Sequence, residues 1–191
     1  MRPFEIDQTW TLFLDRDGVI NHRIPGAYVR RPSEFKFLPG VKGALAAFTN
    51  QFSKILIVTN QQGVGKGLMT QKDLDTVHHY LKHEVGTHGG RLDGIYACTG
   101  LASDNPPCRK PNPGMGAQAK ADFPEIDFKC SIMVGDSLTD ILFGQKLGMK
   151  TVFLRGKLED EARIDAVNPD LICADLWTFS QLMLSPIKNK P

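Results

Sequence analysis

An apolar segment that stops abruptly at two acidic residues is the feature of this sequence that most constrains its fold. Residues 11–14 read Thr-Leu-Phe-Leu, and Asp15, Arg16, Asp17 and Gly18 follow directly. Strand-forming residues that end at a glycine turn predict a short buried strand. Open sheets of parallel strands place ligands beyond the carboxyl ends of the strands, so we expect Asp15 and Asp17 at a binding site.

The two acids leave the expected strand on the same side, because side chains two residues apart share a face. Carboxylates at the edge of a buried sheet are unfavourable unless they are paired or bound to a cation. Oxygen ligands of this kind favour a hard divalent ion, most simply Mg²⁺. Taken alone, Asp-x-Asp-Gly could also be a solvated acidic turn. The residues at the ends of the other strands are needed to distinguish such a turn from a metal site.

Segments typical of strands and of helices alternate along the rest of the chain, which is the pattern of a parallel sheet covered by helices. After the first strand, we expect strands at residues 55–58, 92–97, 131–134, 151–154 and 171–173. Helices are expected after Pro39-Gly40, after Thr70 and after Asn112-Pro113, with Thr70 and Asn112 as N-terminal caps. The predicted fold class is therefore α/β, with a mostly parallel central sheet.

Length, composition and charge exclude several classes of protein. A chain of 191 residues with 41% apolar residues can bury a core, so we expect one domain over residues 1–191, with functional loops at about 22–38 and 98–110. The net charge of +2 is too small to indicate binding of nucleic acid. Four cysteines are too few for a disulfide framework. The N-terminus lacks the apolar core of a signal peptide, and no apolar run approaches ~20 residues. We expect a cytoplasmic protein without membrane contact, and a monomer.

Three further positions carry residues suited to phosphoryl chemistry. Thr59 ends the second strand, Lys110 lies in the loop before the third helix, and Asp136 ends the fourth strand. Asp15 can attack phosphorus in line and form an aspartyl phosphate, while Asp17 protonates the leaving oxygen and later activates water. Asp136 would complete a Mg²⁺ site with Asp15 and the backbone carbonyl of Asp17. The Thr59 hydroxyl and the Lys110 ammonium would bind the phosphoryl oxygens.

Together these motifs resemble the haloacid dehalogenase (HAD) superfamily of phosphatases. The resemblance covers roughly residues 10–155 and rests on Asp15-Arg16-Asp17-Gly18, Thr59-Asn60-Gln61, Cys108-Arg109-Lys110-Pro111 and Gly135-Asp136. More narrowly, segments 13–21 and 109–115 are similar to those of the D-glycero-D-manno-heptose-1,7-bisphosphate 7-phosphatases and the related histidinol phosphatases. The resemblance implies a Rossmann-like three-layer sandwich without a large cap domain, and it implies the same roles for the catalytic residues as those given above.

The resemblance also implies a substrate and the residues that contact it. Such an enzyme removes the 7-phosphate of the heptose bisphosphate with Mg²⁺, and supplies heptose for cell-surface glycans such as lipopolysaccharide. The family's role for Arg109 is to help hold the second phosphate, and Asn60 and Gln61 would line the same pocket. The loop after the first strand closes over the sugar in that family with Gly-Tyr-Val, whereas the segment here, Gly26-Ala27-Tyr28-Val29, carries one extra residue.

One departure from the family pattern concerns zinc. Members usually hold a structural Zn²⁺ before Arg-Lys-Pro through Cys-x-His and a later Cys-x-Cys. Here Cys98-Thr99-Gly100 lacks the histidine, and Pro106-Pro107-Cys108 lacks the first cysteine of the later pair. A closed zinc site needs four ligands, and only Cys98 and Cys108 remain. We therefore predict that this chain has no structural zinc, and that prolines order the loop instead.

Some signals have simpler interpretations. Segment 63–67, Gly-Val-Gly-Lys-Gly, is similar to a phosphate-binding loop, but no Ser or Thr follows Lys66, so we interpret it as a flexible exit from the second strand. Arg23, Arg30 and Arg31 could add positive charge near the site, although loop arginines are more often solvated. Asp140 is either a partner of the Mg²⁺ site or the cap of the following helix.

Three functional hypotheses remain open from the sequence. The first is the heptose bisphosphate phosphatase, with the anomer at the sugar's first carbon unspecified. The second is a phosphatase of histidinol phosphate or of a nucleic-acid 3′-phosphate, and the near-neutral charge counts against nucleic acid. The third is a binding protein that keeps the fold without turnover, against which the intact pair of Asp15 and Asp17 counts.

Overall fold

A six-stranded sheet forms the centre of the computed structural model, which describes residues 2–156, 160 and 162–184. Its strands are β1 (Thr11–Leu14), β2 (Lys54–Asn60), β3 (Gly94–Cys98), β4 (Ser131–Gly135), β5 (Lys150–Leu154) and β6 (Leu171–Cys173). Each neighbouring pair is parallel, and the strand order is β3-β2-β1-β4-β5-β6. The predicted α/β fold class with a parallel sheet is therefore confirmed.

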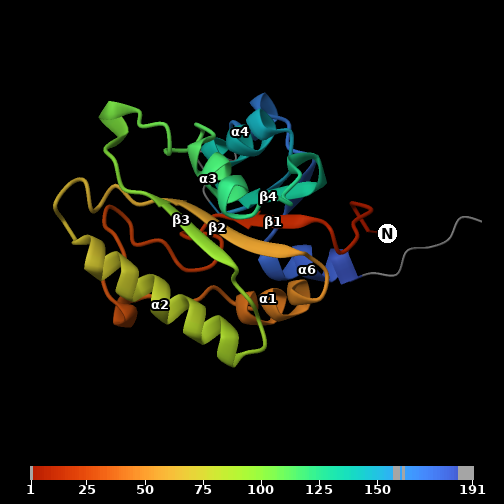
Figure 1. The fold of residues 1–191 in the computed structure, drawn as a ribbon, viewed down its shortest axis with the longest axis horizontal. Coiled ribbons are helices and arrows are strands. Elements are labelled where there is room, and N and C mark those ends of the chain that lie inside the picture. Colours follow the sequence, from red (N-terminus) through yellow and green to blue (C-terminus); the bar gives the residue numbers. More distant parts are fainter. Residues whose placement is uncertain (1, 157–159, 161, 185–191) are drawn as a thin grey trace, which may run out of the picture.

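Helices cover both faces of this sheet (Figure 1). The α-helices of the described residues are α1 (Val41–Thr49), α2 (Gln71–Thr87), α3 (Gly114–Asp122), α4 (Leu138–Leu147) and α6 (Leu176–Leu184). Helices α1, α2 and α6 pack on one face, and α3 and α4 pack on the other, which gives three layers. No separate cap domain interrupts the described part of the chain. None of the helices described is both long and apolar enough to cross a lipid bilayer.

Alternate residues of the central strands face opposite layers. Leu12 and Leu14 of β1 pack in the core under α1, α2 and α6, whereas Phe13 between them packs with α3 and α4. All three side chains are completely buried, as expected for parallel strands that are covered on both faces. Burial of each such side chain contributes about 1.5–3 kcal/mol, so a one-residue slip of β1 would be strongly unfavourable. This core therefore fixes where β1 ends.

The helix starts agree with the sequence in one case and differ in another. Thr70 caps α2 as predicted, because its hydroxyl accepts from the Asp73 backbone while the Asp73 carboxylate accepts from the Thr70 backbone. The prediction that Asn112 caps α3 is wrong. Its amide donates instead to Asn105 and to the Pro106 carbonyl, and α3 starts after Pro113 without a side-chain cap. Asn112 therefore holds the loop that precedes it.

The pairing of β1 with β4 joins distant parts of the chain. Leu14 pairs with Val134, and the backbone N–H of Asp15 donates to the Val134 carbonyl at 3.0 Å. Both strands end at the same edge of the sheet, so Asp15 and Asp136 emerge side by side. The edge at which the parallel strands end is where an open α/β sheet binds ligands.

Candidate active site

A cavity of about 550 Å³ lies at the carboxyl ends of β1, β2 and β4. It collects most of the site residues predicted from the sequence, and its lining includes Asp15, Asp17, Gly26, Tyr28, Thr59, Asn60, Arg109, Lys110 and Asp140. The strands contribute the residues at the base of the cavity, and the loops that follow them contribute the walls. Segments far apart in the sequence thus form one polar site.

Asp15 lies at the base of the cavity and is only 6% exposed. Its Oδ1 accepts a hydrogen bond of 2.8 Å from the Lys110 ammonium. Burial raises the pKa of Asp15 to about 7, against the lowering effect of Lys110 and with a further rise from Asp140 and Asp136. A carboxylate in this position is desolvated, which suits a nucleophile that must attack without a hydration shell.

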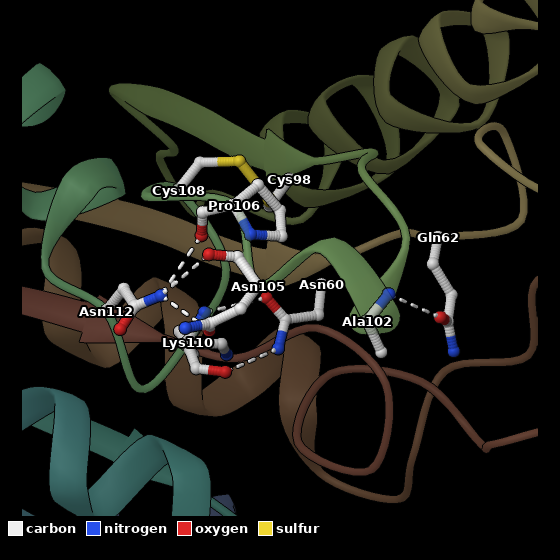
Figure 2. The surroundings of a disulfide bond; sticks show 9 residues. All are labelled: Asn60, Gln62, Cys98, Ala102, Asn105, Pro106, Cys108, Lys110 and Asn112. Atoms are coloured by element: carbon white, nitrogen blue, oxygen red, sulfur yellow. Dashed lines mark hydrogen bonds between the residues drawn. A yellow bond between two sulfur atoms is a disulfide. The ribbon is translucent and has the colours of Figure 1, made fainter.

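Lys110 is a buried cation between two carboxylates and is 3% exposed. Its ammonium donates to Asp15 and to the Val58 carbonyl at 2.7 Å, and it lies 2.6 Å from Asp140 Oδ1. Burial lowers the pKa of Lys110, but Asp140 and Asp15 outweigh this effect and raise it, so the group stays charged. The side chain of Asn60 holds the Lys110 backbone from both sides, accepting from its N–H at 3.0 Å and donating to its carbonyl at 3.2 Å (Figure 2).

Three buried carboxylates gather where the sequence predicts a metal ion. One oxygen from each of Asp15, Asp136 and Asp140 lies within 4.8 Å of the others. Burial raises the pKa of Asp136, so a dication close by would be favourable. Gly18 lies against this cluster, because a Cβ at this position would overlap the Asp136 carboxylate. An oxygen-only donor set fits Mg²⁺, with Asp15 and Asp136 as the predicted side-chain ligands.

Asp140 lies both in the carboxylate cluster and in the capping box at the start of α4. It caps α4, where its carboxylate accepts from the Ser137 backbone N–H at 3.1 Å and from the Ser137 hydroxyl at 2.6 Å. Its other oxygen contacts Lys110, and the side chain belongs to the carboxylate cluster. The cap therefore fixes a carboxylate that in turn fixes Lys110.

Asp17 faces the cavity and accepts hydrogen bonds on both carboxylate oxygens. Asn21 donates to Oδ1 at 2.8 Å, Gln61 donates to Oδ2 at 2.7 Å, and Arg16 donates to both oxygens at 3.1 and 2.9 Å. Burial raises the pKa of Asp17, but the charge of Arg16 and the hydrogen bonds from Asn21 and Gln61 outweigh it and hold the pKa below its usual value. In the free protein Asp17 is thus a fixed carboxylate, the form that acts as a general base, and it must take up a proton before it can act as a general acid.

Gln61 departs from its predicted place in the pocket wall. Its side chain is 1% exposed and is absent from the cavity lining, because its amide donates to Asp17 and, at 2.9 Å, to the Thr59 hydroxyl. The next residue, Gln62, lines the cavity instead. Gln61 therefore supports two predicted catalytic groups from behind. Gln61 directly follows Asn60 in the sequence, and this position alone does not tell whether its side chain points into the cavity or away from it.

Arg23 adds positive charge at the site, which is one of the two roles that the sequence left open for it. Its Nε donates to Asp136 Oδ2 at 2.8 Å, and its Nη2 donates to Asp136 Oδ1. The same Nη2 lies 3.9 Å from Asp15 Oδ2. The guanidinium therefore neutralises the carboxylate cluster from the side of loop 22–38. Arg31 of the same loop pairs with Glu34 on the surface.

Replacing Arg23 by alanine is expected to tighten the binding of Mg²⁺ to the substrate-free protein by about fivefold. Hydrogen bonds to a charged group contribute about 1.5–3 kcal/mol, and partial exposure of the Arg23 side chain reduces this toward about 1 kcal/mol. Calorimetric titration of the metal-free protein with Mg²⁺ measures the change directly, with Arg31→Ala as the matched control. Unchanged or weaker affinity in Arg23→Ala would show that the guanidinium does not compete with the ion.

Two loops meet over the cavity through Tyr28. The aromatic ring of Tyr28 packs on Gly63, where an added Cβ would lie 2.8 Å from the ring, and Lys66 Nζ lies 5.8 Å from the ring centroid. Lys66 also lines the cavity. Segment 63–67, interpreted as the exit from β2, therefore also contributes Lys66 to the wall of the cavity. Arg109 lies in the same wall, and its Nη1 is buried without a hydrogen-bond partner in the described residues, which leaves this donor available for a ligand anion.

The loop before Lys110 is closed by a disulfide bond between Cys98 and Cys108 (Figure 2). This bond was not predicted, because four cysteines were too few to indicate a disulfide framework. The two Cα atoms lie 5.3 Å apart, since the loop folds back on the end of β3. The two cysteines left over from the family's zinc pattern are thus bonded to each other. Asn112 also holds this loop, because its amide donates to the Pro106 carbonyl.

Comparisons with known proteins agree with this geometry. A model of the HAD-hydrolase-like family matches residues 107–179. The chain is 42% identical over 132 residues to a D-glycero-alpha-D-manno-heptose-1,7-bisphosphate 7-phosphatase of Mycobacterium tuberculosis, covering 69% of this chain and 70% of that protein. It is 37% identical over 144 residues to a D-glycero-beta-D-manno-heptose-1,7-bisphosphate 7-phosphatase of Helicobacter pylori, covering 75% of this chain and 82% of that protein.

The fold is also similar to that of solved structures. The D,D-heptose 1,7-bisphosphate phosphatase of B. bronchiseptica, complexed with magnesium and phosphate, superposes with a TM-score of 0.84 and 28% sequence identity. This superposition covers 92% of the present chain and 98% of that one. The D,D-heptose 1,7-bisphosphate phosphatase of Burkholderia thailandensis gives a TM-score of 0.69, also at 28% identity, and covers 93% of this chain and 99% of that chain.

Proposed function

Because the chain belongs to the heptose-1,7-bisphosphate 7-phosphatase family of HAD-like hydrolases, we propose that it removes the 7-phosphate of D-glycero-D-manno-heptose 1,7-bisphosphate. The contact of Lys110 with Asp15 beside the Asp136 carboxylate is the observation that carries this proposal. It places a nucleophile, a fixed positive charge and a candidate Mg²⁺ site around one point at the base of the cavity. A binding protein without turnover would have no need of this arrangement.

The residues of the site divide the reaction into two steps. Asp15 attacks the phosphorus atom, and Asp17 gives a proton to the sugar oxygen as it leaves. Water then attacks the aspartyl phosphate after Asp17 has taken one of its protons. Lys110 and the Thr59 hydroxyl hold the phosphoryl oxygens, on which charge is spread in the transition state. Asp15, Asp136 and the Asp17 backbone carbonyl would hold Mg²⁺, which would neutralise negative charge on the phosphoryl group.

The side of the cavity that Arg109 and Lys66 line is suited to the second phosphate of the proposed substrate. Arg109 presents a buried nitrogen without a partner in the described residues, and a guanidinium is well suited to a phosphate. Gly26 and Tyr28 lie in the part of the wall formed by loop 22–38, where the sugar would be covered. The proposed substrate is thus held at both ends, with its 7-phosphate at Asp15 and its 1-phosphate toward Arg109.

A panel of phosphate esters tests this proposal. Release of phosphate with Mg²⁺ is expected to show the highest kcat/KM for the α or the β anomer of the heptose 1,7-bisphosphate, with histidinol phosphate and a 3′-phosphorylated oligonucleotide at least about tenfold lower. Comparison of the two anomers assigns the configuration, which the relatives leave open because they are named for both. Preference for histidinol phosphate or for the oligonucleotide would reassign the substrate, and no release from any ester would favour a binding protein.

A further inference from the structure

Arg16, between the two predicted catalytic acids, turns away from the cavity into the protein. Its side chain is completely buried although it carries a permanent charge. Its Nη2 donates to both oxygens of Asp17, and its Nη1 lies 3.0 Å from Nε2 of His78. His78 lies on α2, on the face of the sheet opposite α3 and α4 (Figure 1). A continuous chain of hydrogen bonds therefore runs from α2 to the carboxyl group of Asp17.

The direction of these hydrogen bonds follows from the chemistry of the groups. An arginine side chain can only donate, so His78 must accept through a neutral ring whose proton is on Nδ1. Burial and the adjacent charge of Arg16 lower the pKa of His78 to about 3, which agrees with a neutral ring over the whole working range of pH. The histidine thus acts as a fixed acceptor and carries no charge that would repel Arg16.

His78 is well placed to fix Arg16, because the guanidinium has few other anchors. Its Nε is buried without a hydrogen-bond partner in the described residues. The orientation of the planar group is therefore set by the Asp17 carboxylate at one end and by the His78 ring at the other. Because Arg16 is held at both ends in this way, the Asp17 carboxylate that it binds cannot rotate freely away from the cavity.

We propose that His78 is a positioning residue for proton transfer, since it fixes Arg16, which in turn fixes the carboxyl group of Asp17 at the leaving oxygen. The inference rests on the proposed phosphatase function. In the step concerned, the bond from Asp15 to phosphorus forms while the bond from phosphorus to the leaving oxygen breaks. The electron pair of the broken bond stays on that oxygen, and a proton moves to it from Asp17, which takes up that proton from solvent when the negatively charged phosphate binds beside it.

Substrates whose leaving groups differ in their need for a proton distinguish a positioning role of His78 from a purely structural one. An alkyl phosphate such as the heptose bisphosphate needs a proton on its leaving oxygen, whereas p-nitrophenyl phosphate leaves readily as a phenolate. We expect His78→Leu to lower kcat/KM for the sugar phosphate by at least about tenfold, a part of the 10²–10⁴-fold that general acids contribute, and for the aryl phosphate by less than about threefold. kcat/KM is compared because it excludes the later hydrolysis of the aspartyl phosphate.

Two variants serve as controls for this measurement. His79, the next residue of α2, is exposed, and its ring hydrogen-bonds the Asp75 carbonyl of the same helix, so His79→Leu is expected to leave both values unchanged. His78→Gln retains an acceptor and is expected to recover most of the loss. If His78→Leu does not give the circular dichroism spectrum of the folded protein, Arg16→Met provides the same comparison, because it breaks the same chain of hydrogen bonds.

The outcomes separate this inference from the function on which it rests. Equal losses for the alkyl and the aryl phosphate, or no loss for either, in an active enzyme would overturn the positioning role of His78 alone. A wild-type protein that hydrolyses neither ester would overturn the proposed function and the inference together. A selective loss with the alkyl phosphate, recovered in His78→Gln, supports both.

Discussion

Replacing Asp15 by asparagine is expected to lower kcat for the heptose bisphosphate by at least about 10⁴-fold. The amide cannot attack phosphorus, and the loss of a group that acts together with the rest of a catalytic site has effects of this size. The same substitution should also prevent capture of a phosphorylated enzyme. Wild-type protein quenched with acid during turnover should gain the mass of one phosphoryl group on the peptide that contains Asp15, and the variant should not.

The structure supplies a control for misfolding in this experiment. Asparagine has nearly the shape of aspartate and keeps an oxygen that can accept from Lys110, so the variant is expected to remain folded by circular dichroism. Asp15→Ala should lose as much activity, which would exclude rescue by slow deamidation of asparagine. Wild-type turnover by Asp15→Asn and Asp15→Ala would rule out covalent catalysis by this residue.

Replacing Lys110 by methionine is expected to reduce both activity and stability. The ammonium would stabilise charge on the phosphoryl oxygens, and removal of one such group typically lowers kcat by 10²–10³-fold. It also lies between two buried carboxylates, so its loss removes the cation that contacts Asp140 and leaves Asp15 with only the more distant Arg23. Breaking a buried pair in this way destabilises a protein by about 3–5 kcal/mol, which denaturant unfolding of the metal-free protein would measure.

The double variant Lys110→Met, Asp140→Asn separates the two effects. Removing the negative charge of Asp140 relieves its repulsion with Asp15 while an asparagine can still cap α4, so part of the lost stability should return. Activity should not return, because the positive charge at the phosphoryl group is still missing. Stability of the single variant equal to that of wild type would show that the buried ammonium contributes no net stabilisation.

The fold could be predicted from the sequence because its signals are local. Apolar segments bounded by turns gave the strands, and alternation with helices gave a parallel sheet. The same reasoning brought Asp15 and Asp136 together, since parallel strands end at one edge. These predictions needed only the order of residues along short segments, and the structure places all of the strands within one or two residues of the expected positions.

The contacts that could not be predicted involve side chains from separate segments. Arg23 contacts Asp136, Gln61 turns inward to Asp17, and His78 meets Arg16 across the boundary between a helix and a loop. No periodicity in the chain specifies which way such a side chain turns. Cys98 and Cys108 present a similar difficulty, because two cysteines ten residues apart are compatible with a lost metal site, free thiols or a disulfide.

The parallel pairing of β1 with β4 also determines when this protein can first become active during folding. Asp15, the proposed nucleophile, and Asp136, the second proposed metal ligand, follow β1 and β4, and β2, β3 and several helices lie between these two strands in the sequence. Closing so long a loop is entropically unfavourable until the intervening elements have condensed. Recovery of phosphatase activity after dilution from denaturant would therefore report completion of the central sheet, whereas far-ultraviolet circular dichroism would already register helices in fragments that lack a site.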